Sequence, residues 1–351
     1  MTLELDELSH RYGGERAVES VSFDLQAGEL VALLGPSGCG KTTVVQAIAG
    51  HIRPTAGRVR LRGRDVTDEP PESRQVGLVF QQSTLYPHMT VEENVAYGLA
   101  AQDIEDERRD EIVSEYLQLV DIEAQREAYP TELSGGQKRR TELARALAPQ
   151  PDILLLDEPL SALDRTLREQ LRDEIARIQR ETGVTTLFVT HDQEEAMALA
   201  DRLIVMDDGV ISGIGEPRTL YESPPTPFVA SFLGRSNVLS ATVVESDPLI
   251  IDLEGTTMTL PDTDIARSTG DEVTCHIRPE TLSIRSLSGR EPDASLTAKV
   301  TNVADLGRRY DVTVRTNSGT DLVVERVEPV PDVGDSVAVT IPERGLTLFE
   351  S

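Results

Sequence analysis

A glycine-rich loop in the first part of the chain restricts the possible folds more than any other feature. Residues 35–43 read Gly-Pro-Ser-Gly-Cys-Gly-Lys-Thr-Thr, and the segment from Gly35 to Thr42 fits the pattern G-x-x-x-x-G-K-[ST]. The apolar run of residues 30–35 predicts a strand buried on both faces, and residues 42–50 predict the helix that follows the loop. A strand, a glycine loop and a helix in this order predict an α/β fold that binds phosphate.

The residue types in the loop indicate how it would hold a nucleotide. Glycines let backbone N–H groups converge on phosphate oxygens at the positive end of the helix. Lys41 is expected to reach the β- and γ-phosphates, and Thr42 to offer its hydroxyl to Mg²⁺. A chance glycine turn is the alternative, and the strand and helix on either side argue against it. The residues expected to bind nucleotide here are Gly35, Pro36, Ser37, Gly38, Cys39, Gly40, Lys41, Thr42 and Thr43.

A second apolar strand ends in two acidic residues. Residues 153–156 are Ile-Leu-Leu-Leu, and they bring Asp157 to the end of the strand, where its carboxylate can hold Mg²⁺ through water. Glu158 comes next and is placed to polarise an attacking water. A strand that merely ends in acidic residues is the alternative, and the glycine loop in the same chain makes it the weaker one.

Residues 133–137, Leu-Ser-Gly-Gly-Gln, open another helix. Ser134 suits the N-cap, and the two glycines expose backbone N–H groups at the helix N-terminus. One triphosphate does not need two such cradles from one subunit, so we expect this one to serve a nucleotide held by a neighbouring molecule. An ordinary capped helix is the alternative. The residues expected at this second surface are Ser134, Gly135, Gly136 and Gln137.

Together these motifs resemble those of the ATP-binding-cassette (ABC) ATPases, in the family's order, over residues 1 to about 235. The resemblance implies an α/β P-loop NTPase that hydrolyses ATP with Mg²⁺. It also implies a head-to-tail dimer, a homodimer or a pair of paralogous ATPases, with two ATP molecules at the interface. Each ATP would lie between Lys41 of one chain and residues 134–136 of the other.

The same resemblance assigns roles to residues outside these motifs. Tyr12 matches the aromatic side chain that stacks on adenine, with a buried strand tyrosine as the alternative. Gln81 matches the glutamine that senses Mg²⁺ and water and faces the membrane partner, and Asp164 matches a loop that signals between the two subunits. His191 matches the histidine that contacts the γ-phosphate. Catalysis is thus expected of Glu158, His191 and Gln81, and metal binding of Thr42, Gln81 and Asp157.

Two further segments near these motifs receive structural interpretations. Asp192 and Glu195 form the spacing of a helix-capping pair, which predicts a mainly structural role for Asp192. Residues 138–142, Lys-Arg-Arg-Thr-Glu, lack the apolar pair that relatives often carry after the serine-glycine motif. Segment 209–213 also lacks the basic residue that relatives usually carry after the glycine. We expect neither departure to affect the ATP chemistry.

The character of the sequence changes near residue 235. Before it, short apolar strand runs alternate with helix patterns such as residues 106–120. After it come short alternating runs separated by Gly, Asp and Pro, which predict a small β-barrel or a sandwich. We therefore expect an ABC ATPase domain over residues 1–235 and an all-β domain over residues 236–351.

Several segments resemble the importer branch of the family, in which an oligonucleotide-binding-like β-domain follows the ATPase. They are residues 85–99, 191–197, 228–234 and, less closely, 277–280. The resemblance implies two transmembrane permease subunits and, through them, an extracellular solute-binding protein that carries a polyamine, iron(III), thiamine or a sugar. Three other classes of protein are the alternatives. Soluble ABC proteins of translation or DNA repair would carry a second cassette, and fused exporters would carry membrane helices; the sequence shows neither. GTPases and kinases that share the glycine loop have no use for residues 133–137.

Composition bears on the setting of the protein. The formal net charge is -27, and Lys41, Lys138 and Lys299 are the only lysines among 34 basic residues. Such a surface repels nucleic acid and resembles that of halophilic archaeal proteins, with an ordinary acidic protein as the alternative. Two cysteines indicate a reduced compartment, and Cys39 is expected to be a small filler. No apolar run approaches about 20 residues, and the N-terminus lacks a signal pattern, so we expect a peripheral protein on the cytoplasmic face of the membrane.

Overall fold

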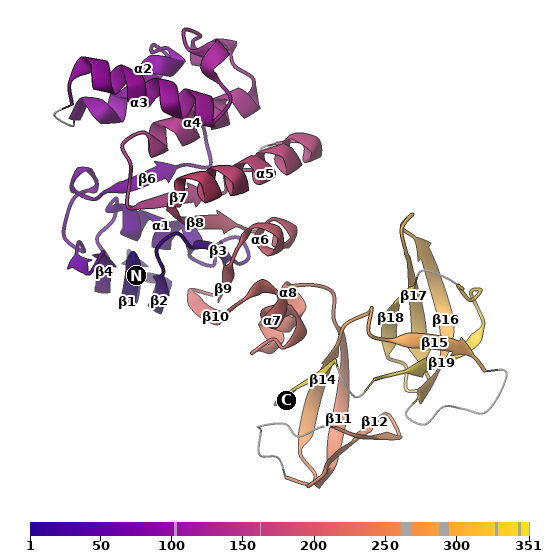
Figure 1. Cartoon of the computed structure of the whole chain (residues 1–351). Coiled ribbons are helices and arrows are strands. Elements are labelled where there is room, and N and C mark those ends of the chain that lie inside the picture. The colour runs from indigo at the N-terminus through magenta and orange to yellow at the C-terminus, as the bar shows by residue number, and fades with distance from the viewer. Residues whose placement is uncertain are drawn as a thin grey trace. The chain divides into compact units, whose positions relative to one another are not determined.

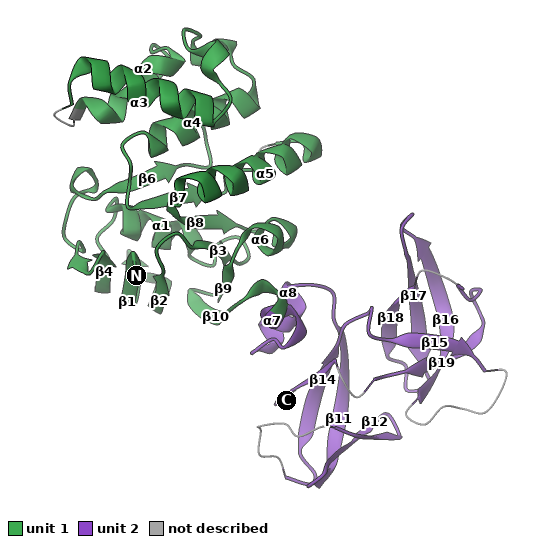
Figure 2. Cartoon of the chain, viewed as in Figure 1, with its two compact units in different colours: residues 1–218 green, residues 219–351 purple. Residues whose placement is uncertain are grey.

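The computed structural model contains two compact units, Met1–Arg218 and Thr219–Ser351 (Figures 1 and 2). It describes residues 1–101, 104–161, 163–260, 268–287, 295–326, 329–342 and 345–350. The domain boundary near residue 235 stays a prediction. Helix α7 (Pro217–Glu222) spans the division of the two units, and α8 (Pro227–Phe232) lies between that division and residue 235.

The first unit is built on a six-stranded sheet with the order β10-β9-β3-β8-β7-β6. Neighbouring strands are parallel except for β10, which pairs antiparallel with β9. Every residue of β3, β7 and β8 is buried, as the uninterrupted apolar runs predict. The strands are β3 (Leu30–Leu34), β6 (Val76–Val79), β7 (Ile153–Asp157), β8 (Thr185–Thr190), β9 (Arg202–Asp207) and β10 (Val210–Gly215).

A second, antiparallel sheet in this unit has the order β2-β1-β4-β5. Its strands are β1 (Leu3–Tyr12), β2 (Glu15–Leu25), β4 (Ala56–Leu61) and β5 (Arg64–Asp65). Helix α1 (Lys41–Ala49) contributes Val44, Val45 and Ile48 to a core cluster that also contains residues of both sheets. One continuous core therefore fixes the glycine loop, which directly precedes α1, between the two sheets.

The remaining helices of the first unit cover the large sheet and form a helical group beside it. Helix α4 contacts α2 and α3 in this group, which Figure 1 shows at one end of the unit. The predicted helix at residues 106–120 is confirmed as α3, with Ile112 and Tyr116 buried. The helices are α2 (Val91–Ala96), α3 (Asp106–Leu119), α4 (Gly135–Leu147), α5 (Arg165–Thr182) and α6 (Gln193–Leu199), with short 3₁₀ turns at Pro71–Ser73, Tyr97–Ala101, Glu123–Gln125 and Pro130–Glu132.

The second unit is dominated by two five-stranded antiparallel sheets that share one hydrophobic core. Buried and exposed residues alternate along β11, the pattern of a strand with one face in the core. The all-β prediction is confirmed, and the described strands form two sheets rather than one. They are β13 (Thr256–Thr259), β12 (Leu249–Leu253), β11 (Asn237–Ser246), β14 (Glu272–Ile277) and β20 (Leu346–Glu350), and β15 (Ser283–Ser286), β19 (Ser336–Thr340), β16 (Ser295–Asp305), β17 (Tyr310–Thr316) and β18 (Asp321–Arg326).

A buried arginine explains why α8 belongs to the second unit. Arg278 directly follows β14 in the chain. Its guanidinium donates to the carbonyl oxygens of Ala230 at 2.7 Å and Gly234 at 3.1 Å. It also lies over the Tyr221 ring, 4.1 Å from the ring centroid. These contacts join the helical segment after residue 218 to the β-sheets, although helix patterns in the sequence group that segment with the ATPase.

No helix among the residues that the structure describes is long and apolar enough to cross a membrane.

Candidate active site

The glycine loop begins the site, because its backbone geometry requires glycine at two positions. A Cβ on Gly35 would lie 2.4 Å from the Met206 carbonyl oxygen. Gly40 has a φ of 101°, and a Cβ there would lie 2.5 Å from Val18 Cγ1. Gly40 is also the N-cap of α1, and a glycine N-cap has no side chain that could bond to the first-turn N–H groups. Those N–H groups are therefore directed at the space in front of the loop, which suits an anion.

Lys41 lies within this loop. Its side chain is buried, and Nζ donates to the carbonyl oxygens of Gly35 at 2.7 Å and Pro36 at 3.0 Å. Cys39 is buried beside it in the core cluster, and burial raises the pKa of its thiol. The thiol therefore stays protonated at neutral pH, in agreement with the prediction that Cys39 fills space.

A pocket of about 330 Å³ opens in front of the loop. It brings together six of the nine residues expected to bind nucleotide at the glycine loop, without Gly35, Pro36 and Cys39, and two residues from distant parts of the sequence, Gln81 and Glu158. The lining residues are Ala17, Ser37, Gly38, Gly40, Lys41, Thr42, Thr43, Gln81 and Glu158. A phosphate chain held by the loop would thus face a carboxylate and an amide.

Glu158 is the centre of a polar network that contains all three residues predicted to be catalytic. Gln81 Nε2 donates to Glu158 Oε2 at 3.0 Å, and His191 Nδ1 lies 3.2 Å from Glu158 Oε1. The backbone of Glu158 has a φ of 44°, a conformation that non-glycine residues rarely adopt. Its N–H donates to the Val189 carbonyl on β8, and the Ser161 hydroxyl donates to its carbonyl oxygen at 3.0 Å. The fold therefore holds this carboxylate in one orientation at the pocket.

Asp157 is the last residue of β7 and is buried. Burial raises the pKa of its carboxyl group, the neighbouring Glu158 adds to the increase, and Lys41 and Arg139 oppose it. A carboxylate that is costly to keep charged favours a cation close to it. Thr42, Gln81 and Asp157 offer hydroxyl, amide and carboxylate oxygens, the donors that Mg²⁺ prefers together with phosphate oxygens.

The second predicted cradle forms a closed capping box at the start of α4. The Ser134 hydroxyl accepts from the Gln137 N–H at 3.3 Å, and Gln137 Oε1 accepts from the Ser134 N–H at 2.8 Å. Ser134 and Gly135 are exposed. Among the described residues that line the Lys41 pocket there is none from segment 134–137, so one chain does not bring its two cradles to the same pocket.

The two remaining predicted nucleotide-binding residues lie at exposed or capping positions. Tyr12 ends β1 and is 48% exposed, which excludes the alternative of a buried strand tyrosine. Its hydroxyl donates to Gln46 Oε1 at 3.3 Å, and its ring meets the edge of His10. Asp164 caps α5 by accepting from the Leu167 N–H at 3.0 Å.

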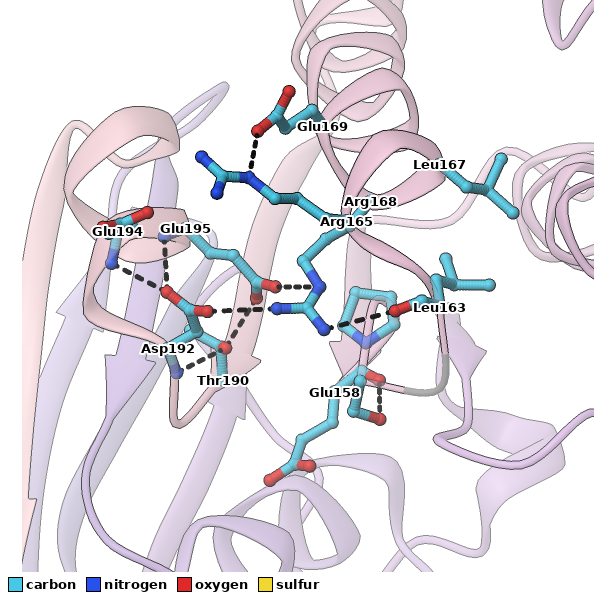
Figure 3. Close-up of polar contacts among 12 residues, drawn as sticks. Glu158, Leu163, Arg165, Leu167, Arg168, Glu169, Thr190, Asp192, Glu194 and Glu195 are labelled. Carbon is cyan, nitrogen blue, oxygen red and sulfur yellow. Dashed lines mark hydrogen bonds and ion pairs between the residues drawn. The ribbon is translucent and has the colours of Figure 1, made fainter. Parts of the chain in front are cut away.

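Arg168 joins the loop before α5 to the start of α6 (Figure 3). Its guanidinium donates to the Leu163 carbonyl at 3.2 Å and lies 3.4 Å from an Asp192 carboxylate oxygen. Asp192 caps α6, as predicted, because its side chain accepts hydrogen bonds from the N–H groups of Glu194 and Glu195. The Glu195 carboxylate does not bond back to the cap, because it accepts from the Thr190 hydroxyl at 2.7 Å.

The segment 138–142 contains one side chain that reaches the backbone beside the site, while the expectation that its departure from the family pattern leaves the ATP chemistry unaffected stays a prediction. Arg139 donates to the carbonyl of Pro159, the residue after Glu158, and to the carbonyl of Gln81. Glu142 forms an ion pair with it at 2.8 Å. The signal in the sequence was the polar run of residues 138–142, which lacks the apolar pair that relatives often carry, and that signal does not reveal the partners of Arg139.

A phosphate loop, an acidic strand end with a bound glutamine and histidine, and a serine-glycine helix start define a P-loop ATPase of the cassette type. The family description "ABC transporter" matches residues 18–161, and the description "TOBE domain" matches residues 275–349. The chain is 42% identical to the spermidine/putrescine import ATP-binding protein PotA of Acidothermus cellulolyticus, over 98% of this chain and 92% of the relative. It is 40% identical to the Fe(3+) ions import ATP-binding protein FbpC 1 of Rhizobium meliloti, over 97% and 95%.

A solved structure extends the comparison to the fold. The dimeric ATP-binding cassette in a post-hydrolysis state, bound to ADP and phosphate, shares 31% identity with a TM-score of 0.55, and the match covers 62% of this chain and 99% of that one. The chain therefore belongs to the ATP-binding subunits of ABC importers. It is an ATPase, and the matched cassette of known structure is dimeric.

Proposed function

We propose that this ATPase hydrolyses ATP in the Lys41 pocket with Glu158 as the general base. The network around Glu158 carries the proposal. Gln81 contacts one of its carboxylate oxygens at 3.0 Å and His191 the other at 3.2 Å, so the carboxylate is oriented before water arrives. In this scheme Lys41 and the loop N–H groups bind the β- and γ-phosphates, His191 contacts the γ-phosphate, and Tyr12 stacks on adenine through its exposed ring.

Mg²⁺ is proposed as the cofactor. Thr42 and Gln81 line the same pocket, and the buried Asp157 is the last residue of β7, directly before the lining residue Glu158. The ion supplies charge neutralisation between phosphate oxygens when it is bound. The chain's own contribution is to present three oxygen donors and to keep Lys41 close to Asp157, where its charge opposes the increase in the Asp157 pKa that burial causes.

The active form is proposed to be a head-to-tail dimer, either of this chain or of this chain with a paralogous ATPase. The separation of the two cradles supports this, because residues 134–137 do not line the described Lys41 pocket of their own chain. Each ATP would lie between Lys41 of one protomer and Ser134, Gly135 and Gly136 of its partner. Asp164, at the cap of α5, is proposed to signal across the same interface.

The proposed solute is a polyamine or iron(III), because import ATP-binding proteins for spermidine/putrescine and for Fe(3+) align over nearly the whole chain. Solute selection would belong to two permeases and an extracellular binding protein. The chain would act on the cytoplasmic face of the membrane through those permeases.

We also propose adaptation to molar salt and a halophilic archaeal source. The relatives named above are bacterial, and the support comes from composition alone, a net charge of -27 with three lysines. Carboxylates spread over the surface repel one another strongly at low ionic strength.

The substitution Glu158→Gln tests the proposed mechanism. It keeps the side-chain shape and removes the group that accepts the proton, so we expect hydrolysis to fall by about 100- to 10,000-fold while ATP binding persists. The variant should accumulate as an ATP-bound dimer in gel filtration. The control is Glu169→Gln, an exposed carboxylate on α5 that pairs with Arg165. Hydrolysis by Glu158→Gln within a few-fold of that control would refute the assigned role.

A further inference from the structure

One buried guanidinium touches the backbone on both sides of the Gln81–Glu158 contact. Arg139, on α4, donates from Nε to the Pro159 carbonyl at 2.7 Å and from Nη1 to the Phe80 carbonyl at 2.7 Å. Nη2 lies 3.4 Å from the Gln81 carbonyl oxygen. Pro159 directly follows Glu158, so this side chain bonds the backbone of Gln81 and of the residue next to Glu158.

Glu142 completes the arrangement one helical turn further along α4. One carboxylate oxygen accepts from Arg139 Nη1 at 2.8 Å, and the other accepts from the Thr84 N–H at 2.9 Å. The side chains of Arg139 and Glu142 are only 8% and 3% exposed. Burying two charges costs free energy unless each is paired and hydrogen-bonded, and here the described contacts satisfy both. A group held this tightly has one geometry, which suits positioning.

We propose that Arg139 is a positioning residue that sets Gln81 and Glu158 at their working distance and ties both to the helix that begins at Ser134. The planar guanidinium fork bonds three carbonyls at fixed angles, which a single-point donor cannot do. The inference rests on the proposed roles of Gln81 and Glu158. It adds a physical link, because any movement of the N-terminus of α4 is passed through Arg139 to the hydrolytic residues of the same chain.

A structural ion pair that merely holds α4 in place is the competing explanation, and the chain offers a matched control for it. Arg140, the next residue on α4, pairs with the buried carboxylate of Glu174 at 3.0 Å and donates to the Asp121 carbonyl. Its described contacts include neither Gln81 nor the segment after Glu158. Arg140→Met with Glu174→Gln therefore removes a comparable ion pair of the same helix.

The test compares that control with Arg139→Met combined with Glu142→Gln. The glutamine keeps an acceptor for the Thr84 N–H and leaves no unpaired buried charge. We expect kcat for ATP hydrolysis to fall by about tenfold to 100-fold, because small displacements of reacting groups have effects of this size. The KM for ATP should change by less than about threefold, since Lys41 and the loop are untouched. Arg139→Lys, which keeps the charge but not the fork, should recover only part of kcat.

Melting curves accompany the kinetics, so that loss of folded protein is separated from loss of positioning. A lowered kcat at an unchanged KM, in protein that melts like the Arg140 control, supports the inference. A kcat equal to that of the control overturns it, as does full recovery by Arg139→Lys. Glu158→Gln keeps the two proposals distinct: if that variant is inactive while the Arg139 variant matches its control, only the link through Arg139 fails.

Discussion

Two helices of the first unit begin with glycine-rich segments, and their N-termini differ in how the backbone N–H groups are bonded. Helix α1 starts after Gly40, which has a left-handed conformation and no side chain to act as a cap. Helix α4 starts after Ser134, whose side chain and that of Gln137 bond each other's N–H groups. The N-terminus of α1 has a buried lysine beside it, whereas that of α4 is exposed and carries no acidic or buried charged partner in its first turn.

The difference shows how one type of local structure serves two purposes. At α1 the donors are free to bind phosphate, and Lys41 adds a formal charge, so this terminus can bind a nucleotide by itself. At α4 two of the donors are already satisfied by side chains of the same turn. The α4 terminus therefore gains little from a free anion, and a role in ATP binding there requires a second molecule that presents the nucleotide at close range.

The largest expected effect follows from removing the charge at α1. Lys41→Ala should weaken ATP binding by about 10- to 100-fold, because bonds to charged groups contribute about 1.5–3 kcal/mol. Ser134→Arg should leave ATP binding unchanged and abolish ATP-dependent dimerisation and hydrolysis, since a long side chain then covers the exposed terminus of α4. Nucleotide titration and gel filtration of both variants measure this contrast. Loss of ATP binding in Ser134→Arg would show that both cradles serve the same nucleotide.

Mixing these two variants sharpens the contrast further. A mixed dimer has one site with both defects and one site with neither, so partial ATPase activity should reappear although each variant alone is inactive. Steady-state hydrolysis against the mixing ratio measures it, with each variant alone at the same total concentration as control. A mixture that stays inactive while heterodimers form would remove the main support for the composite site.

Salt should have a smaller effect, with opposite signs for the whole surface and for α1. The Debye length falls from about 10 Å at 0.1 M salt to about 3 Å at 1 M, which screens repulsion among the many surface carboxylates. We expect the melting temperature to rise over this range of KCl. The KM for ATP should increase at the same time, because Lys41 attracts phosphate through charge. A melting temperature that is flat or falls with KCl would contradict adaptation to salt.

The smallest expected effect is the loss of the cap itself. Ser134→Ala removes one hydroxyl acceptor and should destabilise the unit by about 1 kcal/mol, which lowers its melting temperature by a few degrees. Thr90→Ala is the matched control, because Thr90 and Glu93 form the same capping box at α2. Both variants should lose similar stability, and only Ser134→Ala should also weaken ATP-dependent dimerisation. Equal dimerisation in the two variants would assign Ser134 to helix capping alone.

The sequence predicted these local features because each depends on neighbouring residues. The glycine loop, the buried strands β3, β7 and β8, and the caps at Ser134 and Asp192 all lie within a few residues of the pattern that predicts them. The partners of the Glu195 carboxylate are not specified in this way. Its spacing fits a capping pair, but the Thr190 hydroxyl and Arg168 compete for that carboxylate in the folded chain.

The sequence by itself thus determined the class of ATPase and the residues that were proposed to meet phosphate and water, since these motifs are short and their order is unusual. Only the tertiary structure decided how they meet. Gln81 and Glu158 are 77 residues apart, and the bond between them follows from the pairing of β6 with β7. Arg139 reaches across 59 residues to Phe80 and 20 to Pro159. Contacts of this kind depend on how sheets and helices pack, and no local pattern of residue types specifies them.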